Sequence, residues 1–298
     1  MIGILNVYKP KGMTSHDVVS FARRNLHMKR IGHTGTLDPD AEGVLPILIG
    51  KATKLSDLIM ASEKRYTAKV NLGIITDTED LSGAVLEERE VNVTEEQVAD
   101  AVMSFLGDTE QIPPMYSAIK VDGQKLYQLA RKGIVTERKG RKITIYSLNI
   151  SNFDGNTFDL DVHCSKGTYI RALCRDIGEK LGCGACMGTL VRTQSGNFTM
   201  ENAHTFEEIE ENVKNGTIEN LLISIEDVLT HIKRVDVNTE NAVKVKNGIR
   251  LRPNQLGIEN FEKDELFRIY EENELICILK IIESETEGLV LAMEKSFY

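Results

Sequence analysis

Residues 33–45 read HTGTLDPDAEGVL, a glycine-rich loop that carries three acidic side chains and leads into an apolar segment. Asp38, Asp40 and Glu42 have the spacing of the first ligands of a calcium loop, but Ile49 stands where a bidentate glutamate is required. The glycine-rich motifs that bind phosphate are absent from this stretch. We therefore exclude calcium and phosphate as ligands of the loop.

Two interpretations of Asp38 remain open on the residues alone. Pro39 lacks a backbone donor and restricts Asp38 to extended geometry, and the flanking glycines let a ligand approach the backbone closely. These features suit a lone carboxylate that is held on a rigid loop for covalent catalysis. An isolated Asp-Pro in a glycine-rich loop is more often an ordinary Asx turn, so the loop by itself favours the turn.

Periodicity and turn residues on either side of the loop predict an α+β chain. Strands are expected over 5–8, 66–72, 143–150 and 157–164. Helices are expected over 15–26, 52–62, 125–132, 169–181, 205–213 and 218–229, with a further helix from the capping box at 94–97 to a stop at Gly107. The segment 32–43 is expected to be a loop.

The chain is long enough for two domains, since it has 298 residues. Short alternating strands over 266–270, 275–281 and 289–293 indicate a change of architecture after about Arg234. We expect a first domain over 1–232 and a small β-rich domain over 233–298.

Positive charge is concentrated although the chain is acidic overall. The formal net charge is −9, yet residues 118–142 hold 8 Lys and Arg against 2 Asp and Glu. A polyanion responds to local potential, because exposed charges beyond about 10 Å are largely screened. The segment is therefore a candidate surface for binding a polyanion, although a charged solvated loop is the more common explanation for such a run.

Several classes of protein and site are excluded or disfavoured. No apolar run approaches the roughly 20 residues that span a bilayer, and the first residues show no signal-peptide pattern. Five cysteines imply no disulfide framework and favour a reducing cytoplasm. Cys183 and Cys186 have metal-ligand spacing, but no second pair completes a site. The histidines likewise show no metal spacing, so we expect no metal.

Five motifs in register resemble the TruB family, the tRNA pseudouridine-55 synthases. Residues 3 to about 198 carry the resemblance, and two positions depart from the family pattern: Cys186 stands where the family often has His, and Val191 where it often has Arg. The motifs are Lys9-Pro10-x-Gly12-x-Thr14-Ser15, His33-Thr34-Gly35-Thr36-Leu37-Asp38-Pro39-x-Ala41-x-Gly43-x-Leu45, Lys64-Arg65-Tyr66, Gln111-x-Pro113-x-Met115-Tyr116-Ser117-Ala118 and Ser165-Lys166-Gly167-Thr168-Tyr169-Ile170-Arg171.

The resemblance implies a reaction and roles for named residues. Uridine 55 in the T loop of tRNA would be isomerised to pseudouridine without a cofactor, with Asp38 as the carboxylate at the junction of sugar and base. Arg171 would be its ion-pair partner and keep it ionised. The other implied roles are stacking on the uracil for Tyr66, holding the flipped-out base for His33, and walls of the pocket for Tyr169 and Leu190.

The resemblance also implies a fold and partners. It implies a mixed, mainly antiparallel sheet with flanking helices, followed by a PUA-like RNA-binding domain. Residues 114–142 would be an insertion that clamps the RNA, with phosphate contacts from Arg138, Lys139, Arg141 and Lys142. We expect tRNA as the partner, a monomer, and a cytoplasmic location. The alternative is a non-catalytic protein on the same scaffold that binds or folds tRNA.

Overall fold

The computed structural model describes residues 1–121, 123–286 and 288–298. Its main sheet has ten strands in the order β14-β1-β3-β12-β4-β11-β10-β7, with β13 paired to β12 and β2 paired to β3. The strands are β1 (Gly3–Lys9), β2 (Ile31–His33), β3 (Glu42–Ile49), β4 (Lys64–Leu72), β7 (Gly107–Gln111), β10 (Arg141–Ser151), β11 (Thr157–Cys164), β12 (Ala185–Ser195), β13 (Phe198–Thr199) and β14 (Leu222–Ile223).

All neighbouring strands of this sheet are antiparallel except β12 and β3, which run parallel. The predicted mixed, mainly antiparallel sheet is therefore confirmed. The parallel pair is short, with Val191 opposite Glu42 and Arg192 opposite Gly43. It brings the end of the Asp38 loop against the middle of the sheet.

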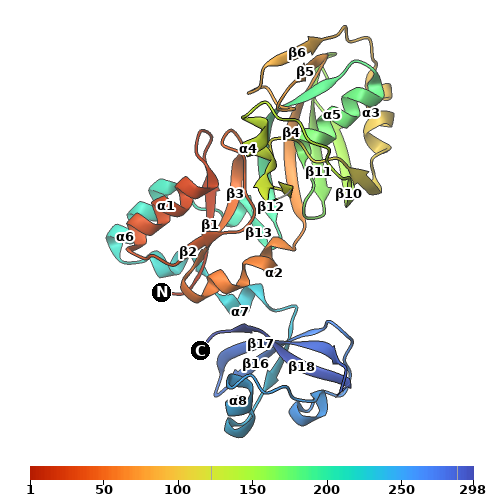
Figure 1. Cartoon of the computed structure of the whole chain (residues 1–298). Helices are drawn as coiled ribbons and strands as arrows, with labels where there is room; N and C mark the ends of the chain where they lie inside the picture. Colours follow the sequence, from red (N-terminus) through yellow and green to blue (C-terminus); the bar gives the residue numbers. More distant parts are fainter. Residues whose placement is uncertain (122, 287) are drawn as a thin grey trace.

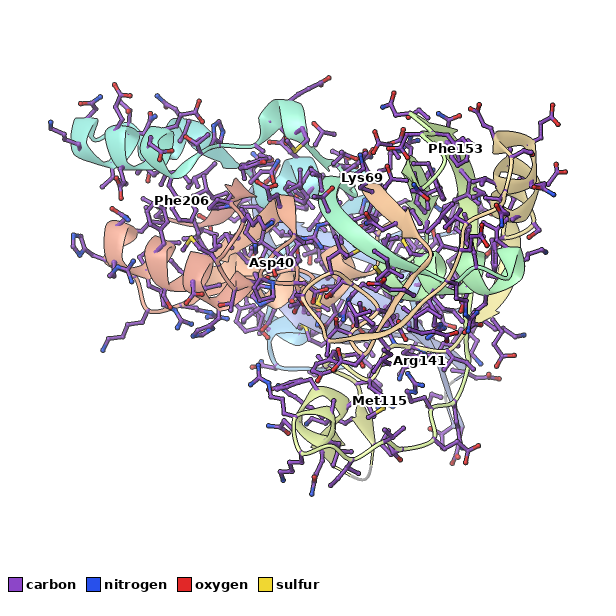
Figure 2. All side chains as sticks on the ribbon, turned by 90° about the horizontal axis from the view of Figure 1, so that it is seen from above. Asp40, Lys69, Met115, Arg141, Phe153 and Phe206 are labelled. Carbon is purple, nitrogen blue, oxygen red and sulfur yellow. The ribbon has the colours of Figure 1, made fainter. Side chains whose placement is uncertain are left out.

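Helices cover the sheet in two groups (Figure 1). At one end α1 (Ser15–Leu26) lies beside α6 (Phe206–Asn215), where the rings of Phe21 and Phe206 stack with centroids 3.9 Å apart. At the other end α5 (Ile170–Leu181) packs on β12 and near α3 (Glu95–Met103). Phe206 and Phe153 lie at opposite ends of the domain, with Asp40 between them (Figure 2).

Smaller elements complete the first part of the chain. A 3-10 helix, Gly50–Leu55, continues into α2 (Ser56–Met60), so only part of the predicted helix over 52–62 is α-helical. The predicted short helix over 125–132 is confirmed as α4 (Leu126–Ala130). The hairpins are β5 (Ile74–Thr76) with β6 (Val85–Glu88), and β8 (Lys120–Val121) with β9 (Gln124–Lys125).

The C-terminal part is a second, four-stranded sheet in the order β15-β16-β17-β18. Its elements are β15 (Lys233–Asp236), α8 (Thr239–Lys246), a 3-10 turn at Pro253–Leu256, β16 (Leu266–Glu271), β17 (Glu274–Ser284) and β18 (Gly288–Ser296). Figure 1 shows this sheet below α2 and α7 (Ile225–Val228). Phe297, after β18, is buried in a hydrophobic cluster that includes Ile4, Leu48 and Leu55 of the first part. The two parts therefore share an apolar interface.

Three of the predicted elements differ from those in the structure. The predicted helix over 218–229 is broken into a 3-10 turn (Ile218–Leu221), β14 and α7 (Ile225–Val228), because residues 222 and 223 pair with the edge of β1. The helix that begins after the Thr94 cap ends at Met103, and Gly107, at a φ of 94°, starts β7 instead. The segment 32–43 contains the end of β2 and the start of β3. No helix in the described part of the chain is long and apolar enough to cross a membrane.

Candidate active site

Asp38 lies in the loop between β2 and β3, and two buried groups hold the backbone of that loop. The Ser15 hydroxyl accepts from the Leu37 backbone N–H at 2.9 Å. The Lys9 ammonium donates to the carbonyls of Pro39 at 3.0 Å and Ala41 at 2.5 Å. Lys9 is fully buried, and burial lowers its pKa. The motif at residues 9–15, which contains Lys9 and Ser15, therefore anchors the loop that carries Asp38.

Arg171, in the first turn of α5, is the ion-pair partner of Asp38. Its Nε lies 3.0 Å from Asp38 Oδ2, and the side chain of Arg171 is only 7% exposed against 40% for Asp38. Nη1 donates to the Thr78 carbonyl at 3.1 Å and Nη2 to the Tyr116 carbonyl at 2.8 Å. Arg171 is thus fixed from several directions and presents its Nε to the carboxylate.

Asp80 is a second carboxylate at the site, and the sequence analysis missed it. Its Oδ2 lies 3.7 Å from the same Nε of Arg171. The hydroxyls of Thr78 and Ser82 donate to Asp80 Oδ1 at 2.7 and 2.6 Å. No motif with a known chemical role marked this loop, and only the fold brings it to α5.

Burial and two charged neighbours act on the pKa of Asp38. Burial raises the pKa of the Asp38 carboxyl, and this effect is larger than the opposing effect of the Arg171 guanidinium; Asp80 raises the pKa further. Arg171 was expected to offset desolvation. It opposes desolvation without cancelling it, and it also lies near Asp80.

The aromatic residues of the predicted site lie around this ion pair. Tyr66 is in β4, and Tyr169 is the residue before α5. Burial is the main cause that raises the pKa of both hydroxyls, and the charge of Asp38 contributes to each rise. The buried Gln111 side chain holds Tyr169 in place, since its amide accepts from the Tyr169 N–H at 2.8 Å and donates to the Tyr169 carbonyl at 3.0 Å.

Leu190 and His33 are the remaining residues of the predicted site. Leu190 is buried in β12, opposite Ala68 of β4. His33 ends β2, and its Nδ1 is buried without a hydrogen-bond partner among the described residues. Burial, together with the nearby charge of Arg192, lowers the His33 pKa and so favours the neutral imidazole.

The cationic side chains at residues 138–142 differ in their exposure to solvent. Lys139, Arg141 and Lys142 are exposed, and the latter two begin β10. Arg138 instead turns inward: its Nη1 donates to the Pro113 carbonyl at 2.9 Å and lies 4.0 Å from Glu79. In the view of Figure 2, Arg141 and Met115 lie on the same side of the molecule.

The described residues contain no group of three or more His, Cys, Asp or Glu side chains that could hold a metal ion. All five cysteines are buried and free. Burial raises the pKa of the Cys186 thiol to about 11. The pair at 183 and 186 is therefore a pair of buried thiols.

Comparison with solved structures defines the class of protein. A structure of an H/ACA RNP bound to a substrate RNA containing 2'-deoxyuridine is similar over 99% of this chain and 85% of that chain, with a TM-score of 0.73 and 25% identity. A Cbf5-Nop10-Gar1 complex is similar over the same shares, with a TM-score of 0.76 and 26% identity. The fold is that of the pseudouridine synthases.

Sequence comparison defines the family. The model of the "TruB family pseudouridylate synthase (N terminal domain)" matches residues 23–170, and that of the "tRNA pseudouridylate synthase B C-terminal domain" matches residues 171–230. A tRNA pseudouridine synthase B of Alkaliphilus oremlandii is 50% identical over 86% of this chain and 85% of the relative. One of Clostridium perfringens (strain 13 / Type A) is 47% identical over 92% of both. The chain belongs to the TruB family of pseudouridylate synthases, and it is an enzyme of the isomerase class.

Proposed function

We propose that this enzyme converts uridine 55 in the T loop of tRNA into pseudouridine, with Asp38 as the reacting carboxylate. The observation that carries the proposal is the pairing of Asp38 Oδ2 with Arg171 Nε at 3.0 Å, on a loop that two buried side chains hold in place. The names of relatives that are 47–50% identical, which call them tRNA pseudouridine synthase B, support tRNA as the substrate.

The reaction is a rearrangement with no net change in atoms or electrons. The bond between C1′ and N1 breaks, the uracil turns, a bond forms between C1′ and C5, and the proton from C5 is lost while N1 gains one. No redox step occurs, so no cofactor is required. Asp38 would stabilise or trap the intermediate by attack on C1′, by attack on the uracil ring, or by assisting elimination to a glycal.

The target base must leave its stack to reach Asp38, at a cost of a few kcal/mol. Tyr66 would stack on the extruded uracil and accept or return a proton, and Tyr169 and Leu190 would form walls around the base. His33 would hold the flipped-out arrangement. Leu190 is buried and Tyr66, Tyr169 and His33 are partly buried, which supports the assignment, because a site that excludes water strengthens the polar contacts that the detached base requires.

The remaining parts would bind the RNA. We propose that residues 1–232 form the catalytic domain, that residues 114–142 clamp the T stem-loop, and that the domain over 233–298 is a PUA-like RNA-binding module. Lys139, Arg141 and Lys142 are exposed, which supports contacts with phosphates. We further propose that the enzyme acts as a monomer in the cytoplasm, where its tRNA substrate is found.

The experiment is incubation of the enzyme with an unmodified T-stem-loop RNA, followed by nucleoside analysis and mapping of the modified position. Pseudouridine at position 55 is the expected product. Pseudouridine elsewhere, on total RNA, would indicate an enzyme of the same class with a different substrate. Tight RNA binding with no pseudouridine at any position would favour the non-catalytic alternative.

A further inference from the structure

Arg192 in β12 is a buried cation to which the reaction described above assigns no role. It is only 1% exposed and is among the largest fully buried side chains. Its hydrogen bonds are to backbone carbonyls, and none of the ion pairs among the described residues includes it. Removing a guanidinium from water is costly, and a carboxylate partner usually offsets that cost. The burial of the Arg192 guanidinium without a carboxylate partner therefore requires an explanation.

Two of its donors hold the loop that carries Asp38. Nε donates to the Val44 carbonyl at 2.8 Å, and Nη2 donates to the Gly35 carbonyl at 3.1 Å. These two carbonyls lie on either side of Asp38 along the chain, so one guanidinium ties both arms of the loop. Gly43 packs against the backbone of Arg192, since a Cβ at Gly43 would be 2.3 Å from the Arg192 carbonyl oxygen. Arg192 thus determines the path of the loop.

The same residue lies beside Tyr66. Arg192 is opposite Tyr66 in the pairing of β12 with β4, and opposite Gly43 in the pairing of β12 with β3. Its charge lowers the pKa of the Tyr66 hydroxyl against the larger rise that burial causes. The loop and the tyrosine, which come from different parts of the chain, therefore meet at one guanidinium.

We propose that Arg192 is a positioning residue for the isomerisation, and that its guanidinium keeps the Asp38 loop and the Tyr66 hydroxyl in one arrangement around the target uridine. This inference rests on the proposed function, because it assigns Arg192 to that reaction. Arg192 itself is too deeply buried to touch the substrate. It acts through its two hydrogen bonds and through the positive charge that it places behind Tyr66.

The test compares Arg192→Lys and Arg192→Gln with the wild-type enzyme. Lysine keeps the charge but not the planar fork that reaches two carbonyls, and glutamine keeps donors but not the charge. Arg23→Gln is the matched control, because Arg23 Nη2 donates to the Ile31 carbonyl at 2.9 Å and Arg23 has no assigned part in the site. Single-turnover rates are measured with saturating enzyme on T-stem-loop RNA, beside RNA affinity and thermal unfolding.

The rate is expected to fall by about 10- to 100-fold in Arg192→Gln, because a displacement of ~1 Å at reacting groups costs rate on that order. Arg192→Lys should recover part of the loss, and RNA affinity and the Arg23→Gln control should stay at the wild-type level. A folded Arg192→Gln with the wild-type rate would overturn the proposal. Wild-type enzyme that makes no pseudouridine would instead reject the proposed function.

A second readout separates positioning from a merely structural role. Tyrosine ionisation is followed by ultraviolet absorbance, and Tyr66→Phe identifies the contribution of Tyr66. The Tyr66 transition is expected at higher pH in Arg192→Gln than in Arg192→Lys, because only lysine keeps the positive charge. Identical transitions in the two variants would contradict the proposed charge effect.

If the Arg192 variants do not fold, Gly35→Ala perturbs the guanidinium from the loop side. A Cβ at Gly35 would lie 3.3 Å from Arg192 Nη1, closer than ordinary contact, and the φ of 75° at Gly35 adds backbone strain in the same loop. We expect a lower single-turnover rate with unchanged RNA affinity. A wild-type rate in folded Gly35→Ala would refute the positioning role.

Discussion

The charge of Asp38 is set by burial and by two neighbours that act in opposite directions. Burial raises its pKa, Arg171 lowers it, and Asp80 raises it. Arg171 Nε lies 3.0 Å from Asp38 and 3.7 Å from Asp80, so the two carboxylates share one cation. If the charge of Asp80 is removed, Arg171 should pair with Asp38 alone.

This balance predicts a pH effect. Under the proposed function, catalysis requires the ionised Asp38 carboxylate, so the single-turnover rate should fall as the pH falls through its pKa. Because that pKa is raised, the fall is expected above the ordinary aspartate value of about 3.9. Asp80→Asn removes a like charge and should move the fall to lower pH. The measurement is the pH dependence of the rate of conversion of T-stem-loop RNA.

Asp40→Asn is the control for this shift. Asp40 is an exposed carboxylate in the same loop, and it forms neither of the ion pairs that Arg171 makes. Asp40→Asn should not change the pH at which the single-turnover rate falls on the acid side. An Asp80→Asn profile that moves to higher pH, or does not move, would show that the two carboxylates do not share Arg171.

Only part of this site could be predicted from the sequence. Asp38 and Arg171 stand in contiguous motifs that resemble a known family, and the structure brings their side chains together. Asp80 and Arg192 could not be predicted, because their roles come from contacts between distant parts of the chain, such as that of Arg192 with Val44 across 148 positions. Composition alone could not distinguish a catalytic Asp38 from an Asx turn.

The Asp38 loop, as an element, depends on one close approach of backbones. Gly43 has a φ of 103°, and a Cβ there would lie 2.3 Å from the Arg192 carbonyl oxygen. Gly43→Ala should therefore lower the free energy of unfolding by about 3 kcal/mol or more, through overpacking and backbone strain. Urea denaturation measures this loss.

Gly12→Ala provides the matched control in the neighbouring turn. Gly12 has a φ of 83°, but nothing lies within 4 Å of the position of its Cβ. Only backbone strain is then expected, at about 1–2 kcal/mol. Equal losses in the two variants would show that the contact with Arg192 does not constrain the loop.

Elements with local signals were predicted better than elements with distant partners. The helix over 169–181 was predicted within one residue, because its apolar face and the Gly182 stop are local. The broken helix over 218–229 was not, because β14 forms through pairing with β1 at the other end of the chain. Ser224, which caps α7, is the one local signal of this break.

At the scale of the whole molecule, the two parts are joined by the C-terminal segment. Phe297 is buried against the first part, and the Lys51 ammonium donates to its carbonyl at 2.5 Å. Phe297→Ala should lower the free energy of unfolding by about 3–5 kcal/mol and separate the unfolding of the two parts. Calorimetry should show one transition for the wild type and two for the variant.

Phe261→Ala is the control, since Phe261 packs in the core of the C-terminal sheet alone. It should weaken that sheet without uncoupling it from the first part. A single transition in Phe297→Ala, at the wild-type temperature, would show that the shared apolar cluster does not join the two parts.

Under the proposed function, the exposed cations Lys139, Arg141 and Lys142 should control affinity for RNA. Replacing Lys139, Arg141 and Lys142 together with glutamine should weaken binding and reduce the slope of log affinity against log salt by about 2–3. Arg138→Gln should leave the slope unchanged, because Arg138 is bound to Pro113 and Glu79 within the protein. Titrations at several salt concentrations measure both, and an unchanged slope in the triple variant would refute the role.

The most direct test of the central claim is a comparison of wild-type enzyme with Asp38→Asn on T-stem-loop RNA. Asparagine keeps the size of the side chain but removes the carboxylate that Arg171 holds at 3.0 Å. Single-turnover nucleoside analysis and RNA affinity are measured on the same samples. We predict pseudouridine at position 55 from the wild type, none from Asp38→Asn, and retained RNA binding by both. Pseudouridine formation by Asp38→Asn near the wild-type rate would contradict the account.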